Sequence, residues 1–338
     1  MAENVTYTLK DFKSSNEVRW CPGCGDHAVM NAIQKAMATL GKKHEDYAVV
    51  SGIGCSSRFP YYMSTFGFHT IHGRAAAIAS GVKSANPNLS VWQISGDGDA
   101  LAIGGNHFIH TVRRNIDLNI ILFNNRIYGL TKGQYSPTSE RGKVTKTSPF
   151  GTIEEPFNPG NLVLGARGTF FARSIDSNVK HSQEVCTAAA KHKGTSVVEV
   201  LQNCVIFNHG AYNDINDPKT RADRQIFLKH GEKMLFGANN EKGLVWENGD
   251  LKAVVVGENG YTIDDVLVHD AKTESMNLHH ALIEMALPSL PVAFGVIRDV
   301  EAPFYDEEME KQIAHVQETR KITCMDDLLN SGDTWEVE

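Results

Sequence analysis

The sequence has no apolar run long enough to span a membrane, and its first residues lack the charged and apolar regions of a signal peptide. It contains no long basic run, and its net charge of −7 argues against nucleic acid as the main partner. No internal repeat or low-complexity segment is evident. These absences predict a soluble, cytoplasmic protein that binds neither membrane nor nucleic acid. Its 338 residues, 41% of them hydrophobic, are enough for a sizeable core.

Two apolar runs, 89–94 and 118–123, are predicted to be buried strands, and residues 102–114 between them to be a helix. A strand, a helix and a parallel strand form a βαβ unit, whose strands end at one edge of the sheet. Gly96-Asp97-Gly98 follows the first strand and Asn124-Asn125 follows the second. A carboxylate and an amide oxygen at this edge suit Mg²⁺. This is the pattern by which thiamine-diphosphate enzymes hold their cofactor's pyrophosphate through a metal ion.

The remaining pattern predicts an α/β fold with a doubly wound, mostly parallel sheet. Helices are expected at 28–40, 75–85 and 181–192, and strands at 47–50, 169–173 and 195–201. Residues 129–163 are expected to be a functional loop or lid, and residues 208–250 to be irregular. Further strands are expected at 252–256 and 292–297, and helices at 276–286 and 304–320. We divide the chain into an N-terminal arm (1–17), a main domain (18–250) and a C-terminal extension (251–338).

Six cysteines are present. In a cytoplasmic chain of this size, cysteines indicate metal or redox chemistry more often than disulfides. The Pro-Gly turn between Cys21 and Cys24 lets both thiolates point at one centre. Cys55 and Cys204 each follow a predicted strand, whereas Cys186 lies inside a predicted helix and is expected in the core. Four thiolates can bind zinc or an iron–sulfur cluster. The spacing alone leaves zinc, a cluster, a redox motif and unrelated cysteines all open.

Several segments, in this order, resemble the β subunit of 2-oxoacid:ferredoxin oxidoreductases, most closely the 2-oxoglutarate (KorB-type) members. They are Cys21-Pro-Gly-Cys-Gly25, Ile53-Gly-Cys-Ser56, His72-Gly-Arg-Ala75, Gly96-Asp-Gly-Asp-Ala-Leu-Ala-Ile-Gly-Gly-Asn-His107 and Asn124-Asn-Arg-Ile-Tyr-Gly-Leu-Thr-Lys-Gly-Gln134. The resemblance covers residues 17–235 and implies a sheet of the thiamine-diphosphate-binding (pyrophosphate-domain) type.

The resemblance also implies site residues. One [4Fe–4S] cluster would be ligated by Cys21, Cys24, Cys55 and Cys204. Magnesium would be ligated by Asp97, Asn125 and the carbonyl of Ile127. The cofactor would contact Ile53, Gly54, Cys55, Ser56, His72, Gly73, Arg74, Ala75, Gly98, Asp99, Gly129 and Leu130. Lys132 is expected to bind a substrate carboxylate, because a mobile ammonium suits an anion. Arg58 is expected at the distal carboxylate of 2-oxoglutarate, and His72 is counted with these two as catalytic.

The implied activity is oxidative decarboxylation of 2-oxoglutarate with coenzyme A to succinyl-CoA and CO2, or the reverse. Electrons would pass through thiamine diphosphate and the cluster to ferredoxin. The carboxylate that activates the cofactor would come from a partner α subunit, which predicts a heterodimer or a dimer of heterodimers. The alternatives are a relative specific for pyruvate or another 2-oxoacid, a non-oxidative thiamine-diphosphate decarboxylase or synthase, and a zinc-stabilised, non-catalytic binding protein.

Overall fold

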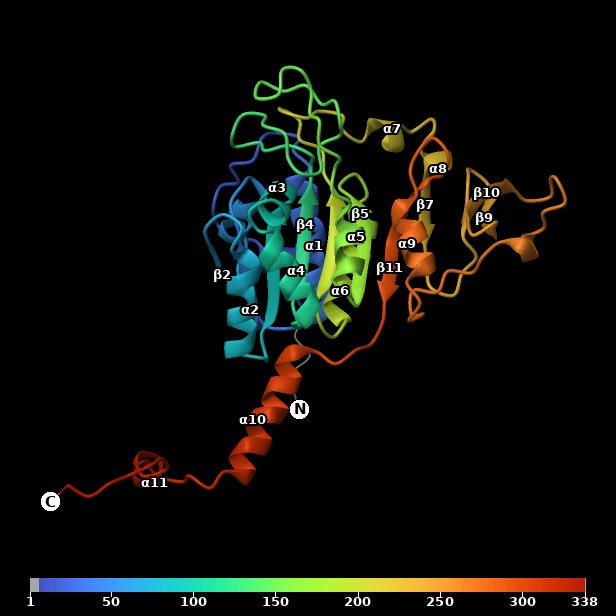
Figure 1. The fold of residues 1–338 in the computed structure, drawn as a ribbon. Helices are drawn as coiled ribbons and strands as arrows, with labels where there is room; N and C mark the ends of the chain where they lie inside the picture. Colours follow the sequence, from blue (N-terminus) through green and yellow to red (C-terminus); the bar gives the residue numbers. More distant parts are fainter. Residues whose placement is uncertain (1–5, 338) are drawn as a thin grey trace.

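The computed structural model describes residues 6–337. Its centre is an eight-stranded sheet in the order β2-β1-β3-β4-β6-β5-β11-β7 (Figure 1). Neighbouring strands run parallel except β5 and β11, which are antiparallel. The strands of this sheet are β1 (Tyr47–Ser51), β2 (Phe66–His69), β3 (Ser90–Gly96), β4 (Asn119–Asn124), β5 (Phe170–Ile175), β6 (Ser196–Leu201), β7 (Gln225–Leu228) and β11 (Val292–Asp299). The predicted doubly wound, mostly parallel α/β fold is confirmed.

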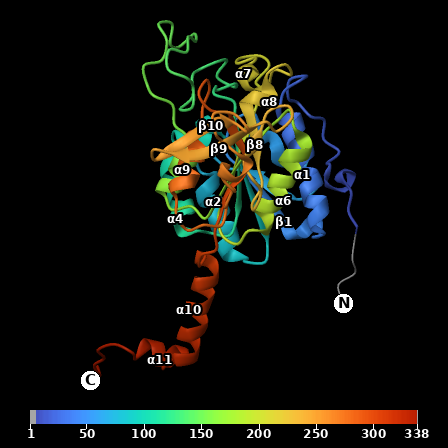
Figure 2. The same ribbon diagram turned by 90° about the vertical axis from the view of Figure 1, so that its right-hand side faces the viewer.

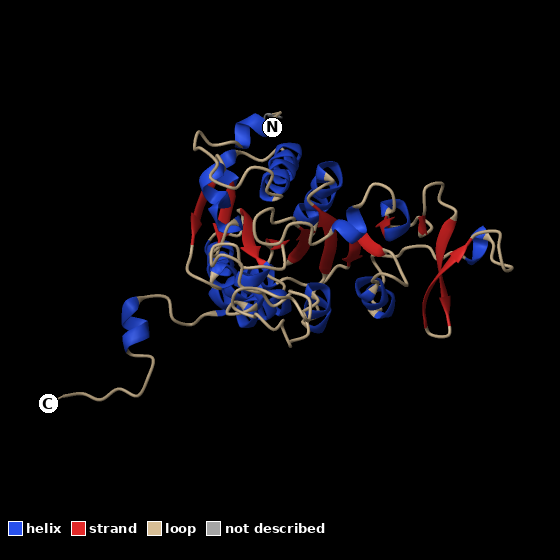
Figure 3. Ribbon diagram, turned by 90° about the horizontal axis from the view of Figure 1, so that it is seen from above, coloured by secondary structure: helices blue, strands red, loops and turns tan. Residues whose placement is uncertain are grey.

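Helices cover both faces of this sheet (Figure 3). Helices α1 and α6 pack on one face, and α2, α4, α5 and α9 pack on the other. The helices are α1 (Asp26–Leu40), α2 (Ala75–Ala85), α3 (Asp97–Leu101), α4 (Gly105–Arg114), α5 (Pro159–Gly165), α6 (Val179–Lys191), α7 (Asn213–Asn216), α8 (Arg221–Arg224), α9 (Asn277–Glu284), α10 (Tyr305–Thr319) and α11 (Met325–Leu329). Short 3-10 helices are Leu9–Phe12, His44–Asp46, Ser56–Tyr62 and Ile263–Asp265.

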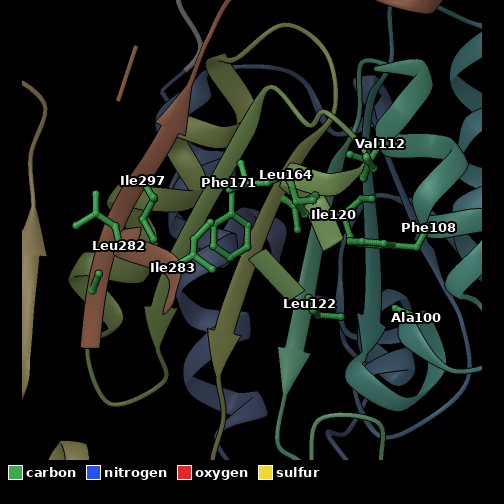
Figure 4. Close-up of a cluster of buried hydrophobic side chains, with 14 of the residues drawn as sticks. Ala100, Phe108, Val112, Ile120, Leu122, Leu164, Phe171, Leu282, Ile283 and Ile297 are labelled. Atoms are coloured by element: carbon green, nitrogen blue, oxygen red, sulfur yellow. The ribbon is translucent and has the colours of Figure 1, made fainter. Parts of the chain in front are cut away.

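The core follows from the period-two pattern of the central strands. In β4, Ile120 and Leu122 belong to the cluster shared with α4, α5 and α9, whereas Ile121 and Phe123 belong to the cluster on the α1 and α6 face. Figure 4 shows the first cluster, in which Phe108 and other apolar side chains from several elements meet over the sheet. Both faces of β4 are therefore buried, as in a parallel sheet between two helical layers.

The expectation that residues 208–250 are irregular is wrong in part. The segment contains β7, and also β8 (Leu235–Phe236) and β9 (Lys242–Glu247), which form a small antiparallel sheet with β10 (Asp250–Val255). Asn248 and Gly249 join β9 to β10, and both have positive φ (54° and 87°). Asn-Gly is the preferred pair for such a two-residue hairpin turn, so a local signal for this hairpin was present in the sequence.

Two further boundaries differ from the expected ones. The helix expected over 102–114 is α4, which begins at Gly105, and a further short helix, α3, comes before it directly after β3. Between α3 and α4, the backbone of Gly104 packs against Gly73. A Cβ atom on residue 73 would lie 2.6 Å from the Gly104 nitrogen, so this contact needs a glycine at 73. In addition, β11 lies between β5 and β7 in the main sheet, so this sheet does not stop at residue 250.

The two ends of the chain lie differently. Residues 1–5 of the expected N-terminal arm are outside the described residues, but Phe12 is fully buried, with its ring centroid 5.5 Å from that of Tyr47. At the other end, α10 and α11 extend away from the body (Figures 1 and 2). Within residues 6–337, no helix has the length and apolar character needed to cross a membrane.

Candidate active site

The predicted βαβ unit brings Asp97 and Asn125 to the carboxyl edge of the sheet, called here the cofactor edge. β3 and β4 pair in parallel, and Asp97 and Asn125 each follow the last residue of its strand. Asp97 is 1% exposed. Burial raises the pKa of its carboxyl, while backbone N–H groups of Gly98 and Asn125 favour the ionised form. The two predicted magnesium ligands are therefore neighbours.

Asp97 is also held by the loop that follows β4. The hydroxyls of Ser136 and Thr138 both donate to its Oδ2, the latter over 2.6 Å. Thr138 Oγ1 also lies 2.9 Å from Asn124 Oδ1, and Ser139 Oγ donates to the carbonyl of Arg126. Part of the expected lid thus packs directly on the predicted metal ligand. Sequence reasoning missed these hydroxyls, because no spacing relates them to Asp97.

The amide of Asn125 is oriented by its own hydrogen bonds. Its Nδ2 donates to Gln202 Oε1 over 2.9 Å, and its Oδ1 accepts from the backbone N–H of Ile127 over 3.2 Å. The Gln202 Nε2 lies 3.4 Å from Cys24 Sγ and donates to the Asn203 carbonyl. A single buried glutamine therefore connects the predicted magnesium ligand with a predicted cluster ligand.

Asp99 joins two of the predicted cofactor loops. Its Oδ1 accepts from the backbone N–H groups of Ile53 (3.1 Å) and Gly73 (2.8 Å) and lies 2.9 Å from His72 Nδ1. Its Oδ2 is buried and lacks a partner within the described chain. Burial raises the pKa of this carboxyl despite these donors. Asp99, predicted as a cofactor contact, thus also organises the loops at 53–56 and 72–75.

The backbone at Gly54 is open to a ligand, whereas the backbone at Gly98 is covered by a side chain. No atom lies within 4 Å of a Cβ built on Gly54, where φ is +138°, so a ligand can approach this backbone. At Gly98, a Cβ would lie 2.2 Å from the ring of Tyr128, whose hydroxyl donates to the Gly98 carbonyl. Ser56 and Ala75 are buried, whereas His72 and Leu130 are exposed. The open backbone at Gly54 fits the approach of a phosphate group.

Four cysteines gather beside the same loops. Cys24 and Cys55 each interact electrostatically with Cys204, and Cys55 also interacts with Cys21. A Cβ on Gly129 would lie 3.2 Å from Cys55 Sγ, so the cysteines adjoin the turn after Asn125. Cys186 is fully buried in α6, and Cys324 is exposed next to α11. The structure therefore separates the four predicted ligands from the other two cysteines.

Burial affects the thiols and the acid beside them. It raises the pKa of Cys55 to about 12 and that of Cys24 further, and the carboxyl of Asp26 adds to both shifts. Burial and Asp176 raise the pKa of Asp26 itself to about 7. Thiols in this setting are protonated at neutral pH, so binding iron or zinc would release protons.

The two predicted substrate-binding residues lie at the surface. Lys132 is exposed and has a left-handed backbone (φ 65°) in the tight turn after Tyr128. Arg58 is exposed, donates from Nε to the Tyr62 hydroxyl and influences Cys55 electrostatically. The structure brings Arg58 close to the cysteines rather than to Asp97.

Below the site lies a buried ion pair that sequence reasoning also missed. Arg173 Nε donates to Glu199 Oε2 over 2.7 Å, and their side chains are 6% and 3% exposed. Glu199 Oε1 accepts from Asn124 Nδ2 over 2.7 Å. Because β4 and β6 are adjacent, this pair supports the end of β4 from which the predicted metal ligand projects.

Replacing Arg173 with Met should destabilise the fold, because Glu199 would keep a buried charge without its partner. Losing one partner of a buried pair costs about 3–5 kcal/mol. Urea unfolding measures the change. The matched control is Lys252→Met, which breaks the exposed pair with Glu247 and should change stability little. Equal losses in both variants would contradict a supporting role for the buried pair.

Comparison with known proteins identifies the family. The family model described as "Thiamine pyrophosphate enzyme, C-terminal TPP binding domain" matches residues 52–200. The 2-oxoglutarate oxidoreductase subunit KorB of Mycobacterium tuberculosis is 47% identical over 332 residues, which cover 97% of this chain and 88% of the relative. The 2-oxoglutarate synthase subunit KorB of Methanocaldococcus jannaschii is 42% identical, over 71% of this chain and 86% of the relative.

A solved structure shows the same likeness in three dimensions. The 2-oxoglutarate:ferredoxin oxidoreductase of Magnetococcus marinus, with 2-oxoglutarate, coenzyme A and succinyl-CoA bound, superposes with a TM-score of 0.79 at 29% identity. The match covers 98% of both chains. This chain therefore belongs to the KorB-type β subunits of the 2-oxoacid:ferredoxin oxidoreductases, with a thiamine-diphosphate-binding fold.

Proposed function

We propose that this β subunit binds thiamine diphosphate through Mg²⁺, carries a [4Fe–4S] cluster, and acts on 2-oxoglutarate with coenzyme A and ferredoxin. The main support for the proposal is that the predicted cofactor site and the predicted cluster site share the loop at 53–56. Cys55 lies inside the loop at 53–56, whose backbone is tied to Asp99. Cofactor and cluster would then adjoin, as electron transfer between them requires. The M. marinus enzyme was solved with the same 2-oxoacid and with coenzyme A, which supports this choice of substrates over pyruvate.

The side chains around Asp97 suit the metal and the pyrophosphate. Asp97, the Asn125 amide and the Ile127 carbonyl supply the hard oxygen ligands that Mg²⁺ prefers. The loops at 53–56 and 72–75, with Gly98, Asp99, Gly129 and Leu130, would surround the cofactor. When bound, thiamine diphosphate supplies the electron sink for decarboxylation. His72 would lie beside it, and the exposed Lys132 and Arg58 would bind substrate carboxylates.

The cysteine arrangement favours a cluster over zinc. One zinc ion holds its thiolates about 2.3 Å away, and so draws the four sulfur atoms onto a single point. Within residues 6–337, no three His, Cys, Asp or Glu side chains converge in a way that would hold one metal ion. A cluster spreads its four ligands over four iron atoms. A cluster therefore suits cysteines that lie near one another without meeting at one point.

The proposal includes a partner α subunit that completes the site. Among the described residues, we assign none the role of the carboxylate that activates the cofactor ring. The exposed apolar side chains near the cofactor edge, which include Ile71 and Leu130, offer a surface for that subunit. Alone, the chain should bind cofactor without turnover.

Anaerobic co-purification of the chain with its partner subunit tests the proposal. We expect a brown complex with visible absorption, about four iron atoms per β chain, and reduction of a low-potential acceptor that needs 2-oxoglutarate and coenzyme A. Pyruvate and other 2-oxoacids, assayed in parallel, test the substrate choice. A colourless complex that holds stoichiometric zinc would overturn the oxidoreductase mechanism. A preference for pyruvate would overturn only the choice of 2-oxoglutarate as the substrate.

A further inference from the structure

Two side-chain amides form a chain between the predicted magnesium site and the predicted cluster site. Asn125 Nδ2 donates to Gln202 Oε1 over 2.9 Å. Gln202 Nε2 donates to the carbonyl of Asn203 over 2.6 Å and to Cys24 Sγ over 3.4 Å. Gln202 therefore contacts one residue of each predicted site at the same time.

The strand order holds Gln202 between the two sites. β4 and β6 pair in parallel, with Asn124 opposite Leu201. Asn125 and Gln202 are the next residue on each strand, so they lie side by side. The backbone N–H of Gln202 donates to the carbonyl of Asn124 over 2.9 Å. The glutamine side chain is fully buried, so water does not compete for its amide.

The turn that carries Cys24 packs on another side of Gln202. A Cβ atom on Gly25 would clash with Asp176 and would lie 2.9 Å from Gln202 Cγ. The glycine therefore lets the cysteine turn approach the glutamine closely. The backbone N–H of Gly25 also donates to the carbonyl of Asn203 over 3.2 Å, which ties this turn to the end of β6.

Backbone groups fix the direction in which both amides face. The backbone N–H of Ile127 can only donate, and Asn125 Oδ1 accepts from it over 3.2 Å. The carbonyl of Asn203 can only accept, and Gln202 Nε2 donates to it. With these two ends set, the amides meet as N–H to oxygen. Reversing either amide would place two N–H groups or two oxygens against each other.

This orientation leaves the oxygen of Asn125 as the atom available to a metal ion. Mg²⁺ takes oxygen ligands, and an amide N–H₂ group cannot serve as one. Because Gln202 holds Nδ2, the amide cannot turn this group toward Asp97. Without Gln202, only the bond from the Ile127 N–H would keep the oxygen in place. The glutamine thus selects the atom that Asn125 offers to the metal.

At its other end, the same amide offers an N–H group to a predicted cluster thiolate. Hydrogen bonds to sulfur are among the features that set the reduction potential of an iron–sulfur cluster. Reduction adds negative charge to a cluster, and an N–H donor stabilises that charge. The bond from Gln202 to Cys24 should therefore make the cluster easier to reduce.

We propose that Gln202 is a positioning residue for both sites at once. It holds the Asn125 amide with its oxygen free for Mg²⁺, and its N–H bond to Cys24 raises the reduction potential of the cluster. The inference rests on the proposed function, since it requires a metal ion at Asn125 and a cluster on Cys24. It goes further by making the two sites depend on one buried side chain.

Gln202→Leu, in the complex purified anaerobically with its partner subunit, tests both ends. Leucine removes the acceptor and the donors together. We expect Mg²⁺ to support thiamine-diphosphate binding with about 10- to 100-fold lower affinity, as when a residue that orients a metal ligand is lost. Calorimetric titration at several Mg²⁺ concentrations measures this. We also expect a more negative midpoint potential of the cluster, measured by redox titration followed by visible absorption.

Gln202→Glu separates the two ends. A glutamate keeps an oxygen that accepts from Asn125 Nδ2, so Mg²⁺ affinity should stay close to that of the wild type. It has no N–H for Cys24, and an O–H on a protonated glutamate would face the nearer acceptor, the Asn203 carbonyl. The midpoint potential should therefore fall as it does in Gln202→Leu. A residue that merely supported the fold would not show this split between affinity and potential.

Gln225→Leu is the matched control. Gln225 is also buried and donates from Nε2 to the Ile215 carbonyl over 2.8 Å, but it lies on β7, the last strand of the sheet. This variant should leave the Mg²⁺ affinity and the potential unchanged. If Gln202→Leu also leaves both unchanged in a complex that binds cluster and cofactor, the inference is wrong and the proposed function stands.

Two other results would count against the proposal. Equal loss of Mg²⁺ affinity in Gln202→Leu and Gln202→Glu would show that the glutamine does not select the oxygen of Asn125. A wild-type complex without a cluster, or with cofactor binding that does not depend on Mg²⁺, would overturn the proposed function and this inference with it.

Discussion

Asp97→Ala should abolish Mg²⁺-dependent binding of thiamine diphosphate. The substitution removes a buried carboxylate that accepts from the backbone N–H of Asn125, and with it the charged ligand of the predicted site. Losing partners outside the first coordination shell costs about 10- to 100-fold in metal affinity, so loss of a direct ligand should exceed about 100-fold. Calorimetric titration of the cofactor, with and without Mg²⁺, measures the effect.

The same variant could lose affinity by unfolding, so its stability needs a separate measurement. Removing the carboxylate deletes the hydrogen bonds from the Ser136 and Thr138 hydroxyls, at about 0.5–1.5 kcal/mol for each bond, although Thr138 can still donate to Asn124 Oδ1. Ser136→Ala is the matched control, since it removes one of these hydrogen bonds but leaves the carboxylate in place. It should keep Mg²⁺-dependent binding. Undiminished cofactor affinity in Asp97→Ala would sink the assignment of this residue.

Cys204→Ser should cost the complex its cluster, whereas Cys186→Ser should not. Cys204 lies among the thiols around the loop at 53–56, and a cluster left with three cysteine ligands is expected to lose iron. Cys186 is fully buried in α6, where a serine would bury a hydroxyl and reduce stability by about 1–3 kcal/mol. Iron content and visible absorption after anaerobic purification separate the two effects.

Cys324→Ser is a second control, because Cys324 is exposed at the start of α11. It should retain both iron and stability. Iron loss in the Cys186 or Cys324 variant, with retention in Cys204→Ser, would mean that a different cysteine is the fourth ligand.

Much of the fold follows from local pattern. The apolar runs at 89–94 and 118–123 became β3 and β4, paired in parallel. The helices expected at 75–85 and 304–320 became α2 and α10. The strands could be predicted because a strand buried on both faces is a continuous apolar run, and the helices because their composition favours helix within a short segment. The short strand β7 could not, since four residues hold too few repeats to reveal a period.

Part of the candidate site could likewise be predicted from the sequence, and part could not. The pairing of Asp97 with Asn125 could be expected, because both follow strands of one βαβ unit. The hydroxyls of Ser136 and Thr138 could not, because they reach Asp97 through a loop of irregular conformation. Gln202 and the Arg173–Glu199 pair were also invisible, since their roles depend on which strands are neighbours.

The sequence by itself determined the family, the α/β fold and the location of the predicted metal ligands, because these depend on motifs and periodicities within short segments. Only the tertiary structure decided that β11 joins the main sheet, that Cys21, Cys24, Cys55 and Cys204 lie near one another, and that α10 and α11 extend away from the body. The physical reason is that contacts between distant segments depend on strand order and on where each turn ends. Local propensity does not contain that information.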